Sequence, residues 1–260
     1  MNKNVKIAKE LVKLAKNLVA LDEEGDGSGF QPIIANKQEE LDRAEKEGKK
    51  YILYRNENGR WRIMSCKDFG NVKKGDLGGL IESEDNLSQD GNCWVDTRAV
   101  VTGNAKVYGN ATIQGGIGGF CYIEDNSEIY GNAVISCNYC EITGNAKIYD
   151  AAKILGEKVY ISENAKVYGN AKVSHGDIKG DAKIYGKANI LGGRIDGSAE
   201  VYENSSINGY AHIYGNAKIY GKAQIWGLAN IFGNAEVAGN AEVAGEAKVD
   251  YNVSTGKITK

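Results

Sequence analysis

The sequence predicts an all-β protein that winds as a single-stranded parallel β-helix of the hexapeptide type. Three observations support this prediction. A branched aliphatic residue recurs at steps of mostly six residues from Val95 to Val249, Gly-Asn pairs punctuate the repeat, and small, polar, branched and aromatic residues alternate within each unit. A step of six does not match the 3.6-residue period of an α-helix, whereas short strands joined by corners accommodate it.

Each unit of the repeat reads as a short strand followed by a corner, as in residues 103–111 (GNAKVYGNA). In a strand, Ala and Val face one side while Lys and Tyr face the other. Gly and Asn tolerate left-handed backbone angles, which suits them to the corner. Three units form one coil of about 18 residues. Residues 91–250 therefore predict about nine triangular coils around an Ala/Val/Ile interior.

Stacked coils predict that every third unit lies on the same face. Starting from Val107, tyrosine follows the branched residue in seven successive coils. We expect the uneven spacings to lie in corner loops and these tyrosines to form one row: Tyr108, Tyr130, Tyr149, Tyr168, Tyr185, Tyr202 and Tyr220. The residue before the branched position is mostly lysine, with Glu128 and Glu200 in two coils and otherwise Lys106, Lys147, Lys166, Lys183 and Lys218. We name this surface the Tyr/Lys face; the other two faces are mixed.

Residues 1–35 read as a basic amphipathic leader helix followed by an acidic linker. Residues 1–20 combine an apolar side with five lysines and one glutamate. The lysines interrupt what would be the apolar part of a secretory signal, and no apolar run reaches the ~20 residues of a membrane span. We expect the leader to bind a protein partner, with a cleavable tag or a membrane-surface helix as alternatives.

Residues 36–90 predict a cap over the N-terminal end of the solenoid, where an open edge would promote aggregation. We expect a short polar helix around Asn36–Gly48 and a β-hairpin of Tyr51–Arg55 and Trp61–Ser65, because an Asn-Gly pair closes the segment between these runs. Residues 68–82 lead into the first coil. The tail, residues 251–260, looks too thin for a second cap, so we expect a partner or a second copy there, as a dimer or trimer.

The cysteine count and the charge balance indicate the cellular location and the kinds of site and partner to expect. Five cysteines are an odd number for a disulfide framework and favour a reducing, cytoplasmic location. Cys121 and Cys140 are expected on one face as small core residues, with a disulfide as the alternative in an oxidising setting. The CxxC at 137–140 lacks a second pair, so we expect no metal site. Sixteen Lys/Arg against seventeen Asp/Glu in residues 91–260 disfavour nucleic acid as a partner.

The run at residues 68–95 (DFGNVKKGDLGGLIESEDNLSQDGNCWV), followed by GNAKVYGNA-type repeats, resembles the YdcK-like hexapeptide-repeat proteins of bacteria and their prophages. The resemblance spans about residues 49–250. It implies left-handed winding and a transferase designation, because many acyltransferases share this fold, but it implies no established reaction. The leader is similar to N-termini of otherwise unrelated phage proteins, which implies a phage or prophage origin and an addressing or packaging role.

The resemblance also implies what an enzyme of this class would need. Hexapeptide acyltransferases generally use a histidine as general base at a coil edge, with an acyl carrier along the prism. This chain has two histidines. We expect His212 to point outward near Arg194 and Tyr214, and His175 to lie at a corner beside Asp177. Because the coils contain no long loop to enclose a substrate, we interpret both as solvated surface residues.

The Tyr/Lys face has two interpretations. As structure, rings on adjacent coils stabilise one another by roughly 0.5–1 kcal/mol per pair. As function, aromatic and cationic groups repeating every ~4.8 Å bind a protein or a repeating polymer such as a glycan. We therefore predict a non-enzymatic structural or interaction protein without a cofactor, acting through this face or its coil ends. An acyltransferase that uses acyl-CoA and a virion or fibre component are the alternatives.

Overall fold

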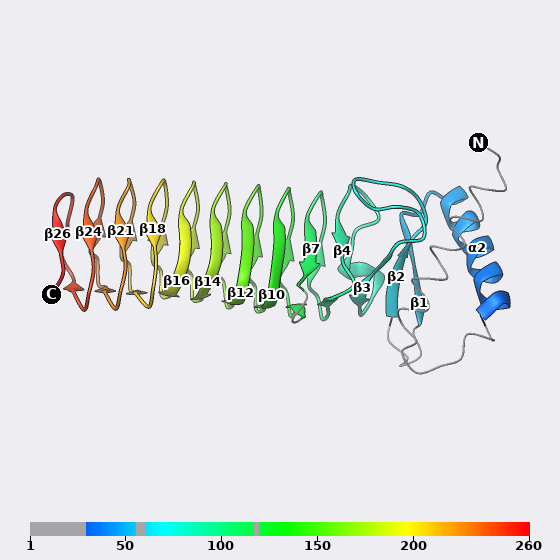
Figure 1. Ribbon diagram of the computed structural model, residues 1–260, viewed down its shortest axis with the longest axis horizontal. Helices are drawn as coiled ribbons and strands as arrows, with labels where there is room; N and C mark the ends of the chain where they lie inside the picture. Colours follow the sequence, from blue (N-terminus) through cyan, green and yellow to red (C-terminus); the bar gives the residue numbers. More distant parts are fainter. Residues whose placement is uncertain (1–29, 56–60, 117–119) are drawn as a thin grey trace.

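The computed structural model describes residues 30–55, 61–116 and 120–260. The predicted leader helix (1–20) and most of the predicted linker lie outside the described residues. The described chain is a parallel β-solenoid of about ten turns with one N-terminal helix, α2 (Phe30–Lys46), which confirms the predicted fold class. The turns stack in a straight row along the long axis, with α2 at one end and the C-terminus at the other (Figure 1). Left-handed winding stays a prediction.

Three stacks of strands form the faces of the prism. The Tyr/Lys face is a separate eight-stranded parallel sheet of two-residue strands: β6 (Lys106–Val107), β9 (Glu128–Ile129), β11 (Lys147–Ile148), β13 (Lys166–Val167), β15 (Lys183–Ile184), β17 (Glu200–Val201), β20 (Lys218–Ile219) and β23 (Glu236–Val237). Bridges from Leu87 to Val107 and from Val253 to Val237 extend it by one residue at each end.

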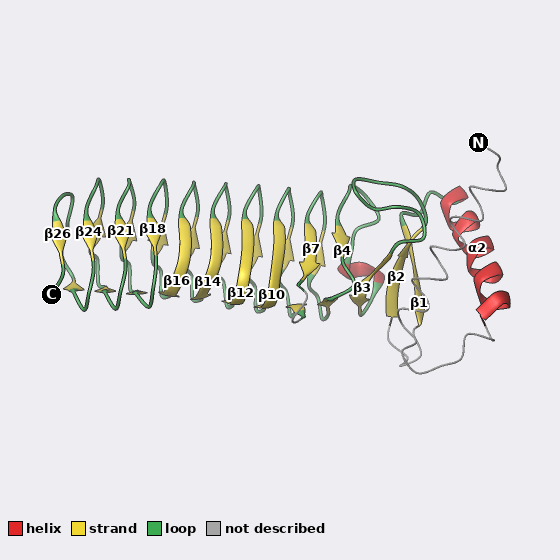
Figure 2. Ribbon diagram, in the orientation of Figure 1, coloured by secondary structure: helices red, strands yellow, loops and turns green. Residues whose placement is uncertain are grey.

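The other two faces share four long strands that continue from one face to the next, visible at mid-length in Figure 2. These are β10 (Val134–Ile142), β12 (Lys153–Ile161), β14 (Lys172–Ile178) and β16 (Asn189–Ile195). The first face is completed by β3 (Leu77–Ile81), β5 (Ala99–Val101), β8 (Cys121–Ile123), β19 (His212–Ile213), β22 (Asn230–Ile231) and β25 (Lys248–Val249). The second is completed by β4 (Trp94–Val95), β7 (Thr112–Gly115), β18 (Ser206–Ile207), β21 (Gln224–Ile225), β24 (Glu242–Val243) and β26 (Lys257–Ile258).

The interior consists of the predicted inward positions. Every branched residue of the series from Val95 to Val249 is buried, and the alanines two residues before them are buried as well. On the Tyr/Lys face, Ile148 lies in register between Ile129 and Val167 of the adjacent coils. The coils therefore stack like on like, and the predicted phase of the repeat is confirmed.

Asparagine and acidic side chains hold successive corners together. The amides of Asn104, Asn126, Asn145 and Asn164 form a row, each donating to the next side chain at 3.0–3.2 Å and the last to Asp181. Some corners carry an acidic residue with positive φ in place of glycine. At one of them, Asp125 (φ 60°) accepts a hydrogen bond from the N–H of Gly144 on the following coil. The corner sequence therefore adds contacts between coils as well as turning the chain.

The predicted hairpin is present with the predicted bounds, as β1 (Tyr51–Arg55) and β2 (Trp61–Ser65) paired antiparallel. β2 also pairs antiparallel with β3, and β3 pairs parallel with β5. The cap hairpin and the other two faces of the solenoid thus belong to one continuous sheet. The buried Lys50 joins them further, because its Nζ donates to the carbonyl oxygens of Asp90 and Cys93 at 3.2 and 3.1 Å.

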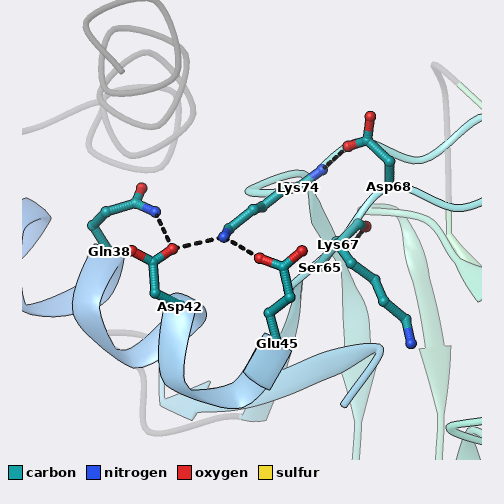
Figure 3. A network of polar contacts seen from close by, with 7 residues as sticks. All are labelled: Gln38, Asp42, Glu45, Ser65, Lys67, Asp68 and Lys74. Atoms are coloured by element: carbon teal, nitrogen blue, oxygen red, sulfur yellow. Dashed lines mark hydrogen bonds and ion pairs between the residues drawn. The ribbon is translucent and has the colours of Figure 1, made fainter. Parts of the chain in front are cut away.

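Helix α2 begins at Phe30, earlier than the expected start near Asn36. Pro32 lies in its first turn, where a proline is tolerated because that N–H has no partner within the helix. Lys74, from the segment before β3, binds Asp42 and Glu45 on α2 (Figure 3). The Asp42 contact measures 2.6 Å, and the hydrogen bond from Lys74 lowers the pKa of Asp42.

The solenoid is longer than predicted at both ends. β3 and Leu87 already belong to the first turn, within the segment expected as cap (36–90), because they pair with β5 and Val107. At the other end Val253 pairs with Val237 and β26 pairs with β24, so part of the expected tail (251–260) adds strand pairing. These end segments lack the Gly-Asn corners that mark the repeat, which explains why nine coils were expected.

Cys121 and Cys140 lie in register on adjacent parallel strands, and a disulfide joins them with Cα atoms 4.8 Å apart. The expected positions of the two cysteines are confirmed. The preferred interpretation, two free thiols in the core, is wrong, and the alternative, a disulfide, is what the structure contains. Both side chains point into the interior at the same level of neighbouring coils, which brings the sulfur atoms together. In the described ranges, no helix has the length and apolar character needed to cross a bilayer.

Candidate interaction surface on the Tyr/Lys face

The seven predicted tyrosines form one continuous stack. Neighbouring rings, from Tyr108 to Tyr220, have centroids 4.8–5.0 Å apart and planes within 6° of parallel. Each tyrosine follows a two-residue strand of the Tyr/Lys face, and the in-register pairing of those strands gives every ring the same outward position. The single row inferred from the sequence is confirmed.

The faces of the rings are occupied by their neighbours, so the rings are half-buried and present edges and hydroxyl groups outward. The hydroxyls of Tyr108, Tyr185 and Tyr220 donate to glutamates of the following coil at 2.9–3.1 Å. The remaining four hydroxyls have no hydrogen-bond partner among the described residues: Tyr130, Tyr149, Tyr168 and Tyr202. These hydroxyls are available to a molecule that lies on the face.

The row that was expected to be mostly lysine is a column of mixed charge, in which lysines and glutamates pair. Three lysines bind a glutamate one coil away: Lys147 with Glu128 at 2.8 Å, Lys183 with Glu200 at 2.9 Å, and Lys218 with Glu236 at 3.8 Å. The hydrogen bonds from the lysines lower the pKa of both Glu128 and Glu200. Glu128 and Glu200 were expected at these positions, but their pairing with lysines was not, and Glu236 in the eighth coil was not expected in the column.

The ring stack predicts a loss of stability at alkaline pH. Burial raises the pKa of Tyr149 to about 12 and also raises the pKa of Tyr108 and Tyr185 above the usual value. These phenols keep their protons in the folded chain at a pH where the unfolded chain, with a pKa near 10, has lost them. The stabilisation is therefore complete below about pH 10 and falls as the pH rises toward 12.

Urea denaturation midpoints measured from pH 8 upward test this expectation, together with phenolate absorbance of the folded protein. The midpoint is expected to fall above about pH 10, and Tyr149→Phe is expected to reduce that fall. Ionisation of all fifteen tyrosines near pH 10 in the folded chain would contradict it.

His212 lies on β19 opposite Arg194 of β16, and its ring stacks on Tyr214 with centroids 4.3 Å apart, as expected. Asp196, which the repeat pattern did not indicate, joins this cluster. Its Oδ2 lies 3.0 Å from His212 Nε2 and accepts a hydrogen bond from Arg194 Nε at 2.7 Å. Burial opposes ionisation of Asp196, but the hydrogen bonds from His212 and Arg194 lower its pKa. His212 is thus part of an ordered polar cluster rather than a freely solvated residue.

His175 is exposed, as expected, and lines a shallow groove that also contains Asp177. Tyr160, Leu191 and Tyr210 contribute exposed apolar surface to this groove. A further aromatic cluster extends along the same side of the solenoid, with centroids 6.0–6.5 Å apart through Phe120, Tyr122, Tyr139 and Tyr160. Its rings are tilted and unevenly spaced in the sequence, which is why no aromatic column was expected there.

No family model matches the chain. Among curated proteins, the chain is similar to a protein of Escherichia coli (strain K12) named "Uncharacterized acetyltransferase YdcK". The two are 34% identical over 96 residues, which cover 36% of this chain and 28% of that protein. The similarity confirms the resemblance inferred from the sequence. The chain is a β-solenoid protein distantly related to that relative, and the matched region spans less than a third of the relative's length.

Proposed function

We propose that the chain is a non-enzymatic interaction protein whose Tyr/Lys face binds another protein. The observation that supports this function best is the seven-ring tyrosine stack, which presents a row of hydroxyl edges beside a column of charges on one straight face. Tyrosine is enriched at protein interfaces because it joins an apolar ring to a polar group. Stacking holds the rings in place, so little side-chain entropy is lost on binding.

A protein partner agrees with the geometry better than a glycan or a nucleic acid. Sugars bind aromatic residues by packing on the ring faces, and in the interior of the stack those faces already contact neighbouring tyrosines. Phosphate backbones need uncompensated cations, whereas Lys147, Lys183 and Lys218 are paired with glutamates. Charges of both signs on a flat face select a partner with a complementary pattern.

Replacing Tyr149, Tyr168 and Tyr185 by serine tests the proposal. Tagged chain is recovered from bacteria that also produce an untagged copy, and the proteins that co-purify are identified by mass spectrometry. We expect at least one protein bound by the wild type to be lost from the triple variant. A matched variant with serine at Lys153, Lys172 and Gln224, which are exposed on the second face, keeps it. Identical sets of co-purified proteins would contradict the proposal. Circular dichroism checks that both variants fold, and if the serine variant does not, phenylalanine at the same three positions keeps the ring stack and removes only the hydroxyls.

The cluster around His212 favours a second candidate function, an acyltransferase. Hydrogen bonding to Asp196 orients the His212 imidazole, which is what a general base for an attacking amine or hydroxyl requires. The name of the E. coli relative points to the same reaction class. Under this alternative, acyl-CoA raises the melting temperature, and both Asp196→Asn and His212→Gln abolish acetylation of an acceptor. The absence of a thermal shift at millimolar acyl-CoA would count against it.

A further inference from the structure

We infer that the protein bound by the Tyr/Lys face is a second copy of this chain, packed face to face with its solenoid axis antiparallel. The inference rests on the proposed function and names its partner. It follows from the order of charges along the column that flanks the tyrosine stack.

That column has a nearly self-complementary order over eight coils. From the N-terminal end its outward residues are Lys106, Glu128, Lys147, Lys166, Lys183, Glu200, Lys218 and Glu236, all in register. A two-fold axis in the plane of the face, between the coils of Lys166 and Lys183, reverses this order in the second copy. It places Lys106 opposite Glu236, Glu128 opposite Lys218, and Lys147 opposite Glu200. In a two-fold interface each contact occurs twice, so these three pairings match six of the eight coils with an opposite charge.

The two central coils carry the one mismatch. Lys166 of each copy lies opposite Lys183 of the other, and like charges across an interface weaken binding. Lys183 is compensated within its own chain by Glu200 at 2.9 Å, whereas Lys166 has no ion pair among the described residues. The centre of the interface is therefore the place where one substitution is expected to tighten it.

The same rotation brings the tyrosine columns together edge to edge. Tyr168 lies opposite Tyr185, Tyr149 opposite Tyr202, and Tyr130 opposite Tyr220. Each of these pairs contains at least one hydroxyl that has no partner among the described residues, so an acceptor or donor in the second copy satisfies it. A dimer with parallel axes would instead place the charged column of one copy over the tyrosine column of the other.

An antiparallel register over eight coils requires a face without twist, and the structure supplies one. Neighbouring ring centroids stay 4.8–5.0 Å apart, close to the ~4.8 Å spacing between paired strands, so successive rings are displaced little sideways, and the coils stack in a straight row (Figure 1). The ends also agree, because the positions beside the inward residue add no charge beyond either end of the column. Next to Leu87, Asn86 is buried and Ser88 is neutral, and at the other end the neutral Asn252 and Ser254 flank Val253.

Charge reversal at Lys147 and Glu200 tests the register, because these residues lie three coils, or roughly 14 Å, apart in one chain and cannot pair within it. Sedimentation analysis of the full chain gives the dimer dissociation constant. We expect Lys147→Glu and Glu200→Lys each to weaken the dimer about tenfold at low salt. The double variant is expected to recover to within about threefold of the wild type, because opposite charges again face each other. Lys153→Glu on the second face leaves the constant unchanged.

Two further measurements sharpen the test. Lys166→Glu replaces both central like-charge contacts by opposite ones and is expected to tighten the dimer about tenfold. A zero-length carbodiimide cross-linker followed by mass spectrometry is expected to join Lys147 to Glu200 and Lys218 to Glu128, pairs that only two copies bring together. Increasing salt is expected to weaken the dimer because these charges are partly exposed to solvent at the face.

A monomer at every concentration, or a dimer that neither single reversal weakens, would overturn the inference. If the effects of Lys147→Glu and Glu200→Lys on the dimer free energy simply add in the double variant, the antiparallel register would be overturned. These failures differ from a failure of the proposed function. If the triple tyrosine variant loses a protein other than this chain while the wild type stays monomeric, the face binds a protein but the partner is not a second copy.

Discussion

Replacing Gly79 by valine is expected to lower the free energy of unfolding by about 3 kcal/mol. Gly79 lies in β3, whose five residues are all buried. A Cβ atom at this position would overlap the carbonyl oxygens of Ala99 and Asp96, which belong to the next turn. β3 pairs with β2 on one side and β5 on the other, so it cannot move away without breaking the sheet that joins cap and solenoid.

Gly233→Val is the matched control for this substitution. Gly233 has φ +66°, and a Cβ atom added there would meet no atom within 4 Å, so valine adds only the strain of a left-handed backbone, about 1–2 kcal/mol. Urea unfolding followed by circular dichroism and by tryptophan fluorescence, which reports on the buried Trp94 beside the cap, distinguishes the two sites. Equal losses at Gly79 and Gly233 would show that close packing at the junction is not what requires glycine there.

The repeat made the interior and one face of the solenoid predictable. In a stacked prism, whether a residue points inward depends on its place in the six-residue unit, and its neighbour is the equivalent residue one coil away. Those two rules place Val107 over Ile129 and align the tyrosines, even where the spacing between coils varies. The uneven spacing does not shift these columns, because the extra residues lie outside them.

The parts that were missed depend on contacts that the period does not specify. β3 has the sequence LGGLI, without the alternation or Gly-Asn corner of the repeat, because it packs against β2 of the cap as well as the next coil. Asp196 follows an inward isoleucine at a corner, and only the path of that corner brings it to His212. The pairing of Cys121 with Cys140 was open for a similar reason, because phase places both thiols in one column but does not decide whether they bond.

The charged column shows the same limit at the candidate site. The residue at each position was predicted from its place in the repeat, and the column was expected to be mostly lysine because five of the seven positions are lysine. Side-chain reach decides the outcome: Lys147 and Lys183 each extend to a glutamate on a neighbouring coil. The charges of these lysine–glutamate pairs therefore cancel, and the net charge of the face does not select a partner. The order of the charges along the column is what can select one.

Replacing Tyr168 by alanine is expected to lower the free energy of unfolding by about 3 kcal/mol. Tyr168 is in the middle of the stack, with Tyr149 and Tyr185 each 4.9 Å away, so its loss removes two ring contacts worth about 0.5–1.5 kcal/mol each together with buried ring surface. Tyr220→Ala, at the end of the stack, removes one ring contact and is expected to have a smaller effect. Denaturant unfolding of both variants measures the difference.

Tyr168→Phe separates the structural role of the ring from its role in binding. Phenylalanine keeps both stacked contacts and removes a hydroxyl that has no partner among the described residues, so stability is expected to change by less than about 0.5 kcal/mol. If the Tyr/Lys face binds through its hydroxyl edges, the same variant binds its partner less tightly although it folds as well as the wild type. A stack that existed only to stabilise the coils would instead give a Tyr168→Phe variant unchanged in both measurements. Equal stability losses for Tyr168→Ala and Tyr168→Phe would show that ring stacking stabilises nothing.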